Sequence, residues 1–250
     1  MLRFVYGTKE RIFVNTSIGC VSSCSYCYLP SINTEQESLR ISVIDAINQV
    51  NQMEVYLPGK ENTIISLGCY SECMHDENIR DTIALINYFC KKQNYVQLAT
   101  KQKISEKTCK MLADNRLFND QINIYISMPT YSQIQLLEPG TASLKDRIFN
   151  IHLCKKYGIN VILYIKPFLE TITFQDEAYY IDLVKKYEIP VVVGGYLSIK
   201  ETEDIADVGE QLLYESKSTA ERELFINKLR AYTDVYGHST DFIHFLRKGN

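Results

Sequence analysis

Three cysteines near the start of the chain carry its clearest chemical signal: Cys20, Cys24 and Cys27. Three and two residues separate them, and a strand predicted over Arg11–Ile18 ends just before the first. Thiolates at these spacings can each take one iron of a cubane cluster and leave the fourth iron an open coordination position. A ferredoxin-type site would close that position with a nearby fourth cysteine, and none follows within this loop. The spacing therefore indicates a [4Fe-4S] cluster with one reactive corner.

A structural zinc site and three unrelated thiols are the alternatives for this loop. Structural zinc takes four ligands, usually as two Cys-x-x-Cys pairs or as cysteines with histidine. The chain has one such pair, and His75 is remote in sequence. In a different functional class, the competing interpretation is therefore a non-catalytic iron-sulfur or zinc module used for electron transfer or assembly.

The other five cysteines divide into two groups. Cys90, Cys109 and Cys154 lie in apolar-periodic helical stretches, where a buried thiol usually behaves as a small hydrophobic side chain. Cys69 and Cys73 follow the second predicted strand, on a loop. Eight cysteines, three of them grouped, indicate metal or redox chemistry in a reducing compartment more than a disulfide framework.

The composition describes one ordinary folded domain. The chain has 250 residues, 46% of them hydrophobic, which is enough for one sizeable core. A net charge of -3 and a pI of about 5.9 provide no global basic field for nucleic acid or acidic membranes. The first residues lack the apolar run of a signal peptide, and the longest apolar runs are far too short to span a bilayer. We expect a soluble cytoplasmic protein with no membrane contact.

Short apolar runs alternate with amphipathic stretches, the pattern of repeated strand-helix units around a parallel sheet. Strands are predicted at Arg11–Ile18, Thr63–Leu67, Val96–Thr100, Ile122–Met128, Asn160–Lys166 and Pro190–Gly194. Helices are predicted at Ile41–Val50, Ile79–Cys90, Lys103–Asn115, Ser143–Tyr157 and Gln175–Tyr187, with Gly158 in a C-cap position. Six repeats are too few for a complete eight-fold barrel. The predicted fold class is α/β: an open, partial TIM-type barrel of six strand-helix units, with its functional face at the carboxyl ends of the strands.

The pattern changes after the sixth strand. A polar stretch over Lys200–Lys217 precedes a helix predicted from Thr219 to about Tyr236, which we expect to cap the barrel. No internal repeat or linker interrupts the chain. Residues 1–250 are therefore predicted to form a single domain.

The cysteine spacing, with aromatic Tyr26 just before the last cysteine and the loop placed after the first strand, resembles the signature of the radical S-adenosylmethionine (SAM) superfamily. That resemblance implies that the amino and carboxylate groups of SAM chelate the open iron. One electron then cleaves the sulfonium, and the adenosyl radical abstracts a hydrogen atom from substrate. The resemblance also implies an electron donor of the flavodoxin or ferredoxin type.

Dispersed segments are similar to one branch of that superfamily, the spore photoproduct lyases, which reverse a thymine dimer in DNA. Cys24–Leu29 reads Cys-Ser-Tyr-Cys-Tyr-Leu and is similar to that family's cluster loop with both tyrosines in place. The other matching segments are Gly68–Glu72, Thr100 and Lys101, Ser127, Glu138 to Ser143 with the trailing Arg147, and Pro167. The likeness covers roughly Arg11 to Phe168. Glu138 and Arg147 form either an ion pair near the barrel mouth or a substrate contact.

The resemblance implies roles for particular residues. Three side chains would contact the methionyl end of SAM: Ser71, Lys101 and Ser127. Tyr26 and the backbone of Lys166 would lie near its adenine. Cys69 would return a hydrogen atom to the product radical, with Tyr28 in the relay between that cysteine and SAM. Thiols and phenols exchange hydrogen atoms readily, so these residue types suit the step.

The chain also departs from the family's pattern. The lyases carry a longer amino-terminal region and a basic, aromatic carboxyl-terminal segment that grips the lesion. Here Lys200–Glu215 is acidic instead, which would repel DNA phosphates if it faced a duplex. Three hypotheses follow: a trimmed lyase acting on a thymine dimer in DNA, a radical SAM enzyme on another nucleotide or small molecule, or a component that needs a partner for substrate contacts.

Overall fold

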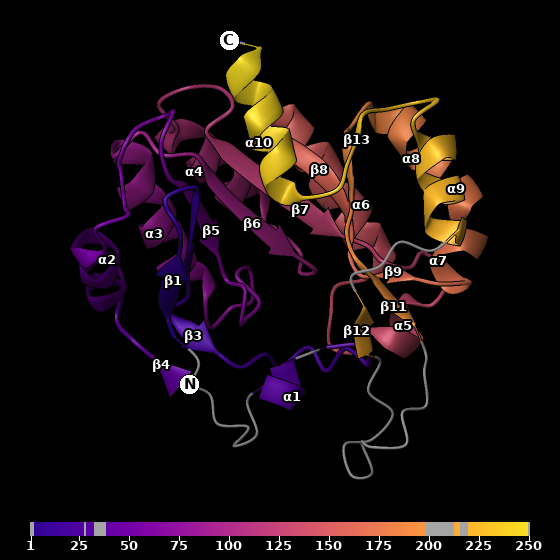
Figure 1. Cartoon of the computed structure of the whole chain (residues 1–250), viewed down its shortest axis with the longest axis horizontal. Coiled ribbons are helices and arrows are strands. Elements are labelled where there is room, and N and C mark those ends of the chain that lie inside the picture. Colours follow the sequence, from indigo (N-terminus) through magenta and orange to yellow (C-terminus); the bar gives the residue numbers. More distant parts are fainter. Residues whose placement is uncertain (1–2, 28, 33–38, 199–212, 216–219, 250) are drawn as a thin grey trace.

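A computed structural model of the chain describes residues 3–27, 29–32, 39–198, 213–215 and 220–249. An eight-stranded sheet forms its centre (Figure 1). In spatial order the strands are β1 (Val5–Gly7), β2 (Arg11–Val14), β5 (Ile64–Leu67), β6 (Val96–Thr100), β7 (Ile122–Ser127), β8 (Asn160–Ile165), β10 (Val191–Val193) and β13 (Val235–Tyr236). β1 pairs antiparallel with β2, and every other ladder of this sheet is parallel.

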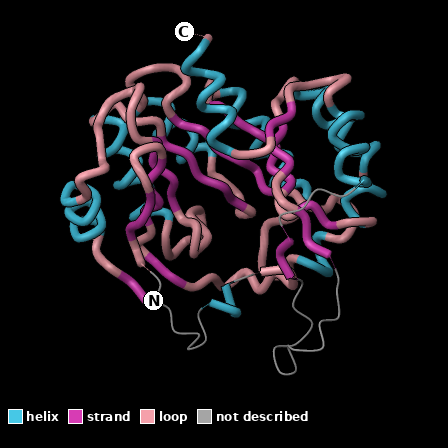
Figure 2. Tube along the Cα trace, viewed as in Figure 1, coloured by secondary structure: helices cyan, strands magenta, loops and turns pink. Residues whose placement is uncertain are grey.

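Helices connect the parallel strands, as the tube in Figure 2 shows. The longer ones are α2 (Val43–Gln52), α3 (Ile79–Lys91), α4 (Glu106–Asn115), α6 (Leu144–Lys156), α8 (Glu177–Tyr187) and α9 (Ala220–Leu229). A further long helix, α10 (Ser239–Lys248), follows β13. Single-turn helices occur at α1 (Leu29–Ile32), α5 (Ile134–Leu137) and α7 (Ile172–Gln175). Two small sheets complete the fold: β3 (Ser17–Ile18) with β4 (Leu39–Arg40), and β9 (Phe168–Leu169) with β11 (Tyr196–Ser198) and β12 (Leu213–Glu215).

Local sequence sets the starts of three connecting helices. Ser42, Ser105 and Ser143 have extended backbones, and each side-chain oxygen accepts a hydrogen bond from an amide in the first turn. Such caps satisfy amides that have no partner inside the helix. Gly158 follows α6 with a positive φ of 62°, as its predicted C-cap position requires.

Alternation along the strands separates two faces of the sheet. Ile12 and Val14 of β2 are fully buried and join the main core beneath the connecting helices, so Arg11 and Phe13 point to the opposite, inner face. α10 packs on that inner face through Phe242 and Ile243. Figure 1 shows α10 lying across the strands at the end away from β3 and α1.

The predicted α/β class and mostly parallel sheet are confirmed, and each of the six predicted strands contains a strand of the main sheet. In the described part of the chain, strand pairing does not close the sheet into a barrel, because β1 and β13 are its opposite edges. These two edge strands were not predicted. The predicted polar stretch lies mostly outside the described residues.

The predicted carboxyl-terminal helix was too long. α9 ends at Leu229, and the segment that follows forms β13 beside β10. β-Branched Thr233 and Val235 favour an extended backbone, and Thr233 donates a hydrogen bond to the carbonyl of Ile189 at 2.8 Å. The helix that caps the inner face is α10, which sequence reasoning missed. No helix in the described ranges is long and apolar enough to cross a membrane.

Candidate active site

The cysteine loop leaves the fold from β3. β3 pairs antiparallel with β4, Ser17 opposite Arg40 and Ile18 opposite Leu39, so this ladder joins the two ends of the segment that contains the cysteine loop. The amide of Gly19 donates to the carbonyl of Tyr70, on the loop after β5, at 2.9 Å. Because β2 and β5 are parallel neighbours, this contact places the cysteine loop at the carboxyl ends of the strands. That edge is where ligands bind in parallel α/β sheets.

Cys20, Cys24 and Cys27 are free thiols; the first is exposed and the other two are half-buried. Burial raises the pKa of Cys24 to about 12, while the Lys101 charge lowers it. Burial also raises the pKa of Cys27. In the described residues, no three His, Cys, Asp or Glu side chains are gathered as a ready metal-binding group. The loop carries three sulfur atoms within eight positions of the chain.

Tyr26 and Lys101 come together in the structure as a pair. The Lys101 ammonium lies 5.6 Å from the centre of the Tyr26 ring, in a cation–π arrangement. Tyr26 is 6% exposed and packs against Leu169. Two residues predicted to bind opposite ends of SAM therefore contact one another beside the cysteine loop. Tyr28, the predicted relay tyrosine, lies outside the described residues.

The loop after β5 carries Cys69 and Ser71 and begins at Gly68. Gly68 has a φ of 66°, and a Cβ there would overlap the Cys73 sulfur. Only glycine tolerates both constraints without a shift. Cys73 is 1% exposed and belongs to the main core, so its side chain packs beneath the loop.

Glu72 ties this loop to the next one. Its carboxylate is 8% exposed and accepts hydrogen bonds from the Thr100 hydroxyl at 2.5 Å and the Lys101 amide at 2.9 Å. It also accepts from the amide of Met74 at 3.2 Å. Sequence reasoning gave Glu72 no role of its own. The available signal was an acidic residue in the loop that follows β5, a strand of the buried parallel sheet.

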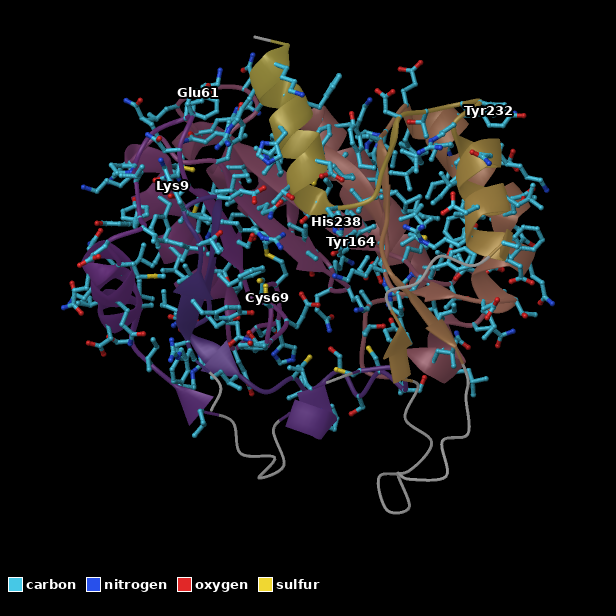
Figure 3. The ribbon with its side chains drawn as sticks, viewed as in Figure 1. Lys9, Glu61, Cys69, Tyr164, Tyr232 and His238 are labelled. Carbon is cyan, nitrogen blue, oxygen red and sulfur yellow. The ribbon has the colours of Figure 1, made fainter. Side chains whose placement is uncertain are left out.

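Cys69 lies toward the centre of the molecule, whereas Lys9, Glu61 and Tyr232 lie at its periphery (Figure 3). Burial raises the pKa of the Cys69 thiol to about 12, against the lowering effect of the charges on Arg11 and Lys166. Desolvation and the Arg11 charge in turn lower the pKa of Lys166. Cys69 is therefore a neutral thiol at physiological pH, and its S–H hydrogen is retained.

Ser127 ends β7 and is 3% exposed. Its carbonyl accepts a hydrogen bond from Arg147 at 2.9 Å, and Arg147 pairs with Glu138 at 2.5 Å. Both charged side chains of the pair are fully buried. The ion-pair alternative for Glu138 and Arg147 is therefore the one that the structure contains. Glu138 also accepts a hydrogen bond from the Tyr26 hydroxyl, which connects this pair to the cysteine loop.

The structure thus brings most of the predicted residues to one edge of the sheet. Tyr26 of the cysteine loop contacts Lys101 directly and is linked to the Ser127 carbonyl through Glu138 and Arg147. Ser71 shares its loop with Cys69. Cys90, Cys109 and Cys154, predicted as buried core thiols, are each 0% exposed.

Comparison with known proteins identifies the family of the chain and relatives of its fold. A family model described as spore photoproduct lyase matches residues 10–193. A spore photoproduct lyase mutant with bound AdoMet and dinucleoside spore photoproduct superposes with a TM-score of 0.65 at 13% identity, covering 91% of this chain and 76% of that one. SuiB of Streptococcus suis bound to S-adenosylmethionine gives a TM-score of 0.65 at 15% identity, covering 93% and 51%. No curated protein sequence matches. Because the family model spans well over half of its length, the chain belongs to the spore photoproduct lyase family.

Proposed function

We propose that this chain is a radical SAM enzyme of the spore photoproduct lyase type, which acts on a thymine dimer in DNA. The observation that carries the proposal is the contact, at one edge of the sheet, between Tyr26 of the three-thiol loop and Lys101 on the loop after β6. Membership of the family supports it, as do solved relatives with bound AdoMet and dinucleoside spore photoproduct. An electron donor of the flavodoxin or ferredoxin type would be its partner.

The donor set fits a [4Fe-4S] cluster held by Cys20, Cys24 and Cys27. Three free thiols lie on one loop, and sulfur is the ligand such clusters take. The raised pKa values of Cys24 and Cys27 mean that binding of the cluster must release protons from these thiols. When bound, the cluster supplies the electron and the open iron position for cleavage of SAM.

The chain's own residues would bind and orient SAM. Ser71, Lys101 and Ser127 would hold its methionyl end, and Tyr26 with the main chain of Lys166 would flank its adenine. Glu72, next to Ser71 in the chain, joins the loop of Ser71 to the loop of Lys101 through its hydrogen bonds to the Lys101 amide and the Thr100 hydroxyl. Holding both reactants in one geometry is the protein's main contribution to cofactor-driven chemistry.

Cys69 would complete the reaction as hydrogen-atom donor. Its S–H hydrogen passes to the carbon radical of the product, and a thiyl radical remains on sulfur. The phenolic O–H of Tyr28 would then refill the thiol, and the tyrosyl radical would take a hydrogen atom from the 5'-deoxyadenosine released by SAM cleavage, which completes the relay between Cys69 and SAM. Burial suits Cys69 to this step, because its raised pKa keeps the hydrogen on sulfur at neutral pH.

Anaerobic reconstitution followed by dithionite and SAM tests the enzyme class. We expect 5'-deoxyadenosine from the wild type and none from Cys24→Ala. Absence of 5'-deoxyadenosine from an iron-loaded wild type would favour a non-catalytic iron-sulfur module.

The same samples with a dimer-containing oligonucleotide test the substrate. Repair supports the lyase assignment, whereas SAM cleavage without repair would reject it and favour another nucleotide or small molecule. Cys69→Ala should keep SAM cleavage but lose clean product formation, and unchanged turnover would remove Cys69 from the mechanism.

A further inference from the structure

The segment from Leu137, the last residue of α5, to Ser143, just before α6, contacts the cysteine loop at several points. The Ser25 amide and hydroxyl both donate to the carbonyl of Leu137, at 2.9 and 3.3 Å. A Cβ on Gly140 would stand 3.3 Å from the carbonyl oxygen of Val21. The cysteine loop therefore lies against this segment with backbone-to-backbone contact.

The same segment also reaches the loop that carries Lys101. The Ala142 amide donates to the Lys101 carbonyl at 3.0 Å, and the Gln102 side chain donates to the Gly140 carbonyl at 3.0 Å. It is thus a bridge between the predicted cluster ligands and a predicted SAM contact.

One buried carboxylate stands at the centre of this bridge. One oxygen of Glu138 accepts the Tyr26 hydroxyl, from a ring placed between Cys24 and Cys27 in the loop. The other oxygen accepts Arg147, which also donates to the carbonyls of Ser127 and Ala142 at 2.9 and 3.1 Å. Through these bonds Arg147 ties the Glu138 carboxylate to the end of β7 and to the segment before α6.

We propose that Glu138, fixed by Arg147, is a positioning residue that holds the cysteine loop through the Tyr26 hydroxyl and sets the electrostatic surroundings of the cluster. The proposal rests on the proposed function for the presence of the cluster. By holding Tyr26, the carboxylate fixes the positions of Cys24 and Cys27, which flank Tyr26 in the loop. In the buried ion pair the carboxylate offsets the charge of Arg147; without it the uncompensated cation would favour addition of an electron nearby, so Glu138 keeps the cluster's midpoint potential low.

Thiol alkylation of the full-length chain without iron tests the positioning. Tyr26→Phe keeps the ring and the ion pair but removes the hydroxyl. A hydrogen bond to a charged group is worth roughly 1.5 to 3 kcal/mol, so we expect alkylation of Cys24 and Cys27 to accelerate about tenfold or more relative to exposed Cys20. Glu106→Gln, which changes the exposed ion pair between Glu106 and Lys156, is the matched control and should leave the alkylation rates unchanged.

Potentiometry of the reconstituted protein tests the electrostatic part. Glu138→Gln should raise the midpoint potential and change the electron paramagnetic resonance spectrum of the dithionite-reduced cluster, and Tyr26→Phe should change the spectrum with a smaller shift in potential. If Glu138→Gln does not fold, as judged by circular dichroism, Tyr26→Phe decides alone.

Wild-type alkylation rates and wild-type spectra in Tyr26→Phe and in any folded Glu138→Gln would overturn the inference. A wild type that holds no iron would instead reject the proposed function, and the alkylation result would still decide the role of the Tyr26–Glu138 bond.

Discussion

Arg147→Met removes the cation of the buried pair with little change in side-chain length. Arg147 is 0% exposed and donates to Glu138, to the carbonyls of Ser127 and Ala142, and to the Thr141 hydroxyl. Breaking one side of a buried pair leaves the other charge without compensation and costs about 3–5 kcal/mol. For a chain of this size, that corresponds to a fall of roughly 6–20 °C in Tm.

Denaturant unfolding of the iron-free chain, followed by circular dichroism at pH 7.5, measures this loss. Lys156→Met, which breaks the exposed pair with Glu106, is the matched control and should leave the midpoint unchanged. The double variant Glu138→Gln/Arg147→Met should recover part of the loss, because Gln keeps an acceptor for Tyr26 without a buried charge. A loss below about 1 kcal/mol in Arg147→Met would refute the reasoning, since the pair would then not be isolated from water.

Burial raises the pKa of Glu138 from 4.5 to about 7, so the folded chain binds more protons than the unfolded chain between those pH values. The stability of the wild type relative to Glu138→Gln, measured by urea titration, should therefore rise as pH falls from about 8 to about 5. A stability difference that does not change with pH would contradict this. Glu72→Gln should lower the free energy of unfolding by about 1.5 to 3 kcal/mol, because an amide hydrogen then faces a backbone N–H. It should also displace Lys101 and so weaken SAM binding measured by calorimetry; an unchanged SAM affinity would show that Glu72 does not position the loop that carries Lys101. Gly68→Ala should lower the stability measured in thermal melts by at least about 2 kcal/mol, because alanine is strained at this positive φ and its Cβ overpacks the loop. Adding Cys73→Ala to this variant should restore part of the stability, since the added Cβ overlaps the Cys73 sulfur.

The order of strands and the location of the cysteine loop followed from local pattern. Buried β-branched runs and 3.6-residue periodicity are properties of neighbours in sequence, so six strands and five helices could be read directly. The tail was misread at Thr233–Tyr236, where edge pairing with β10 overrode an apparent helical continuation. β-Strand formation depends on a partner strand that sequence periodicity does not reveal.

For the site, too, sequence and tertiary structure determined different features. Cysteine spacing alone determined which residues are candidates for a cluster, because three cysteines within eight positions share one loop in any fold. The tertiary structure decided that the Tyr26 hydroxyl meets Glu138, 112 positions away, and that Glu72 joins the loops after β5 and β6. Such contacts arise when parallel strands bring their carboxyl ends together, and the identity of the partner depends on packing between segments that no local pattern connects.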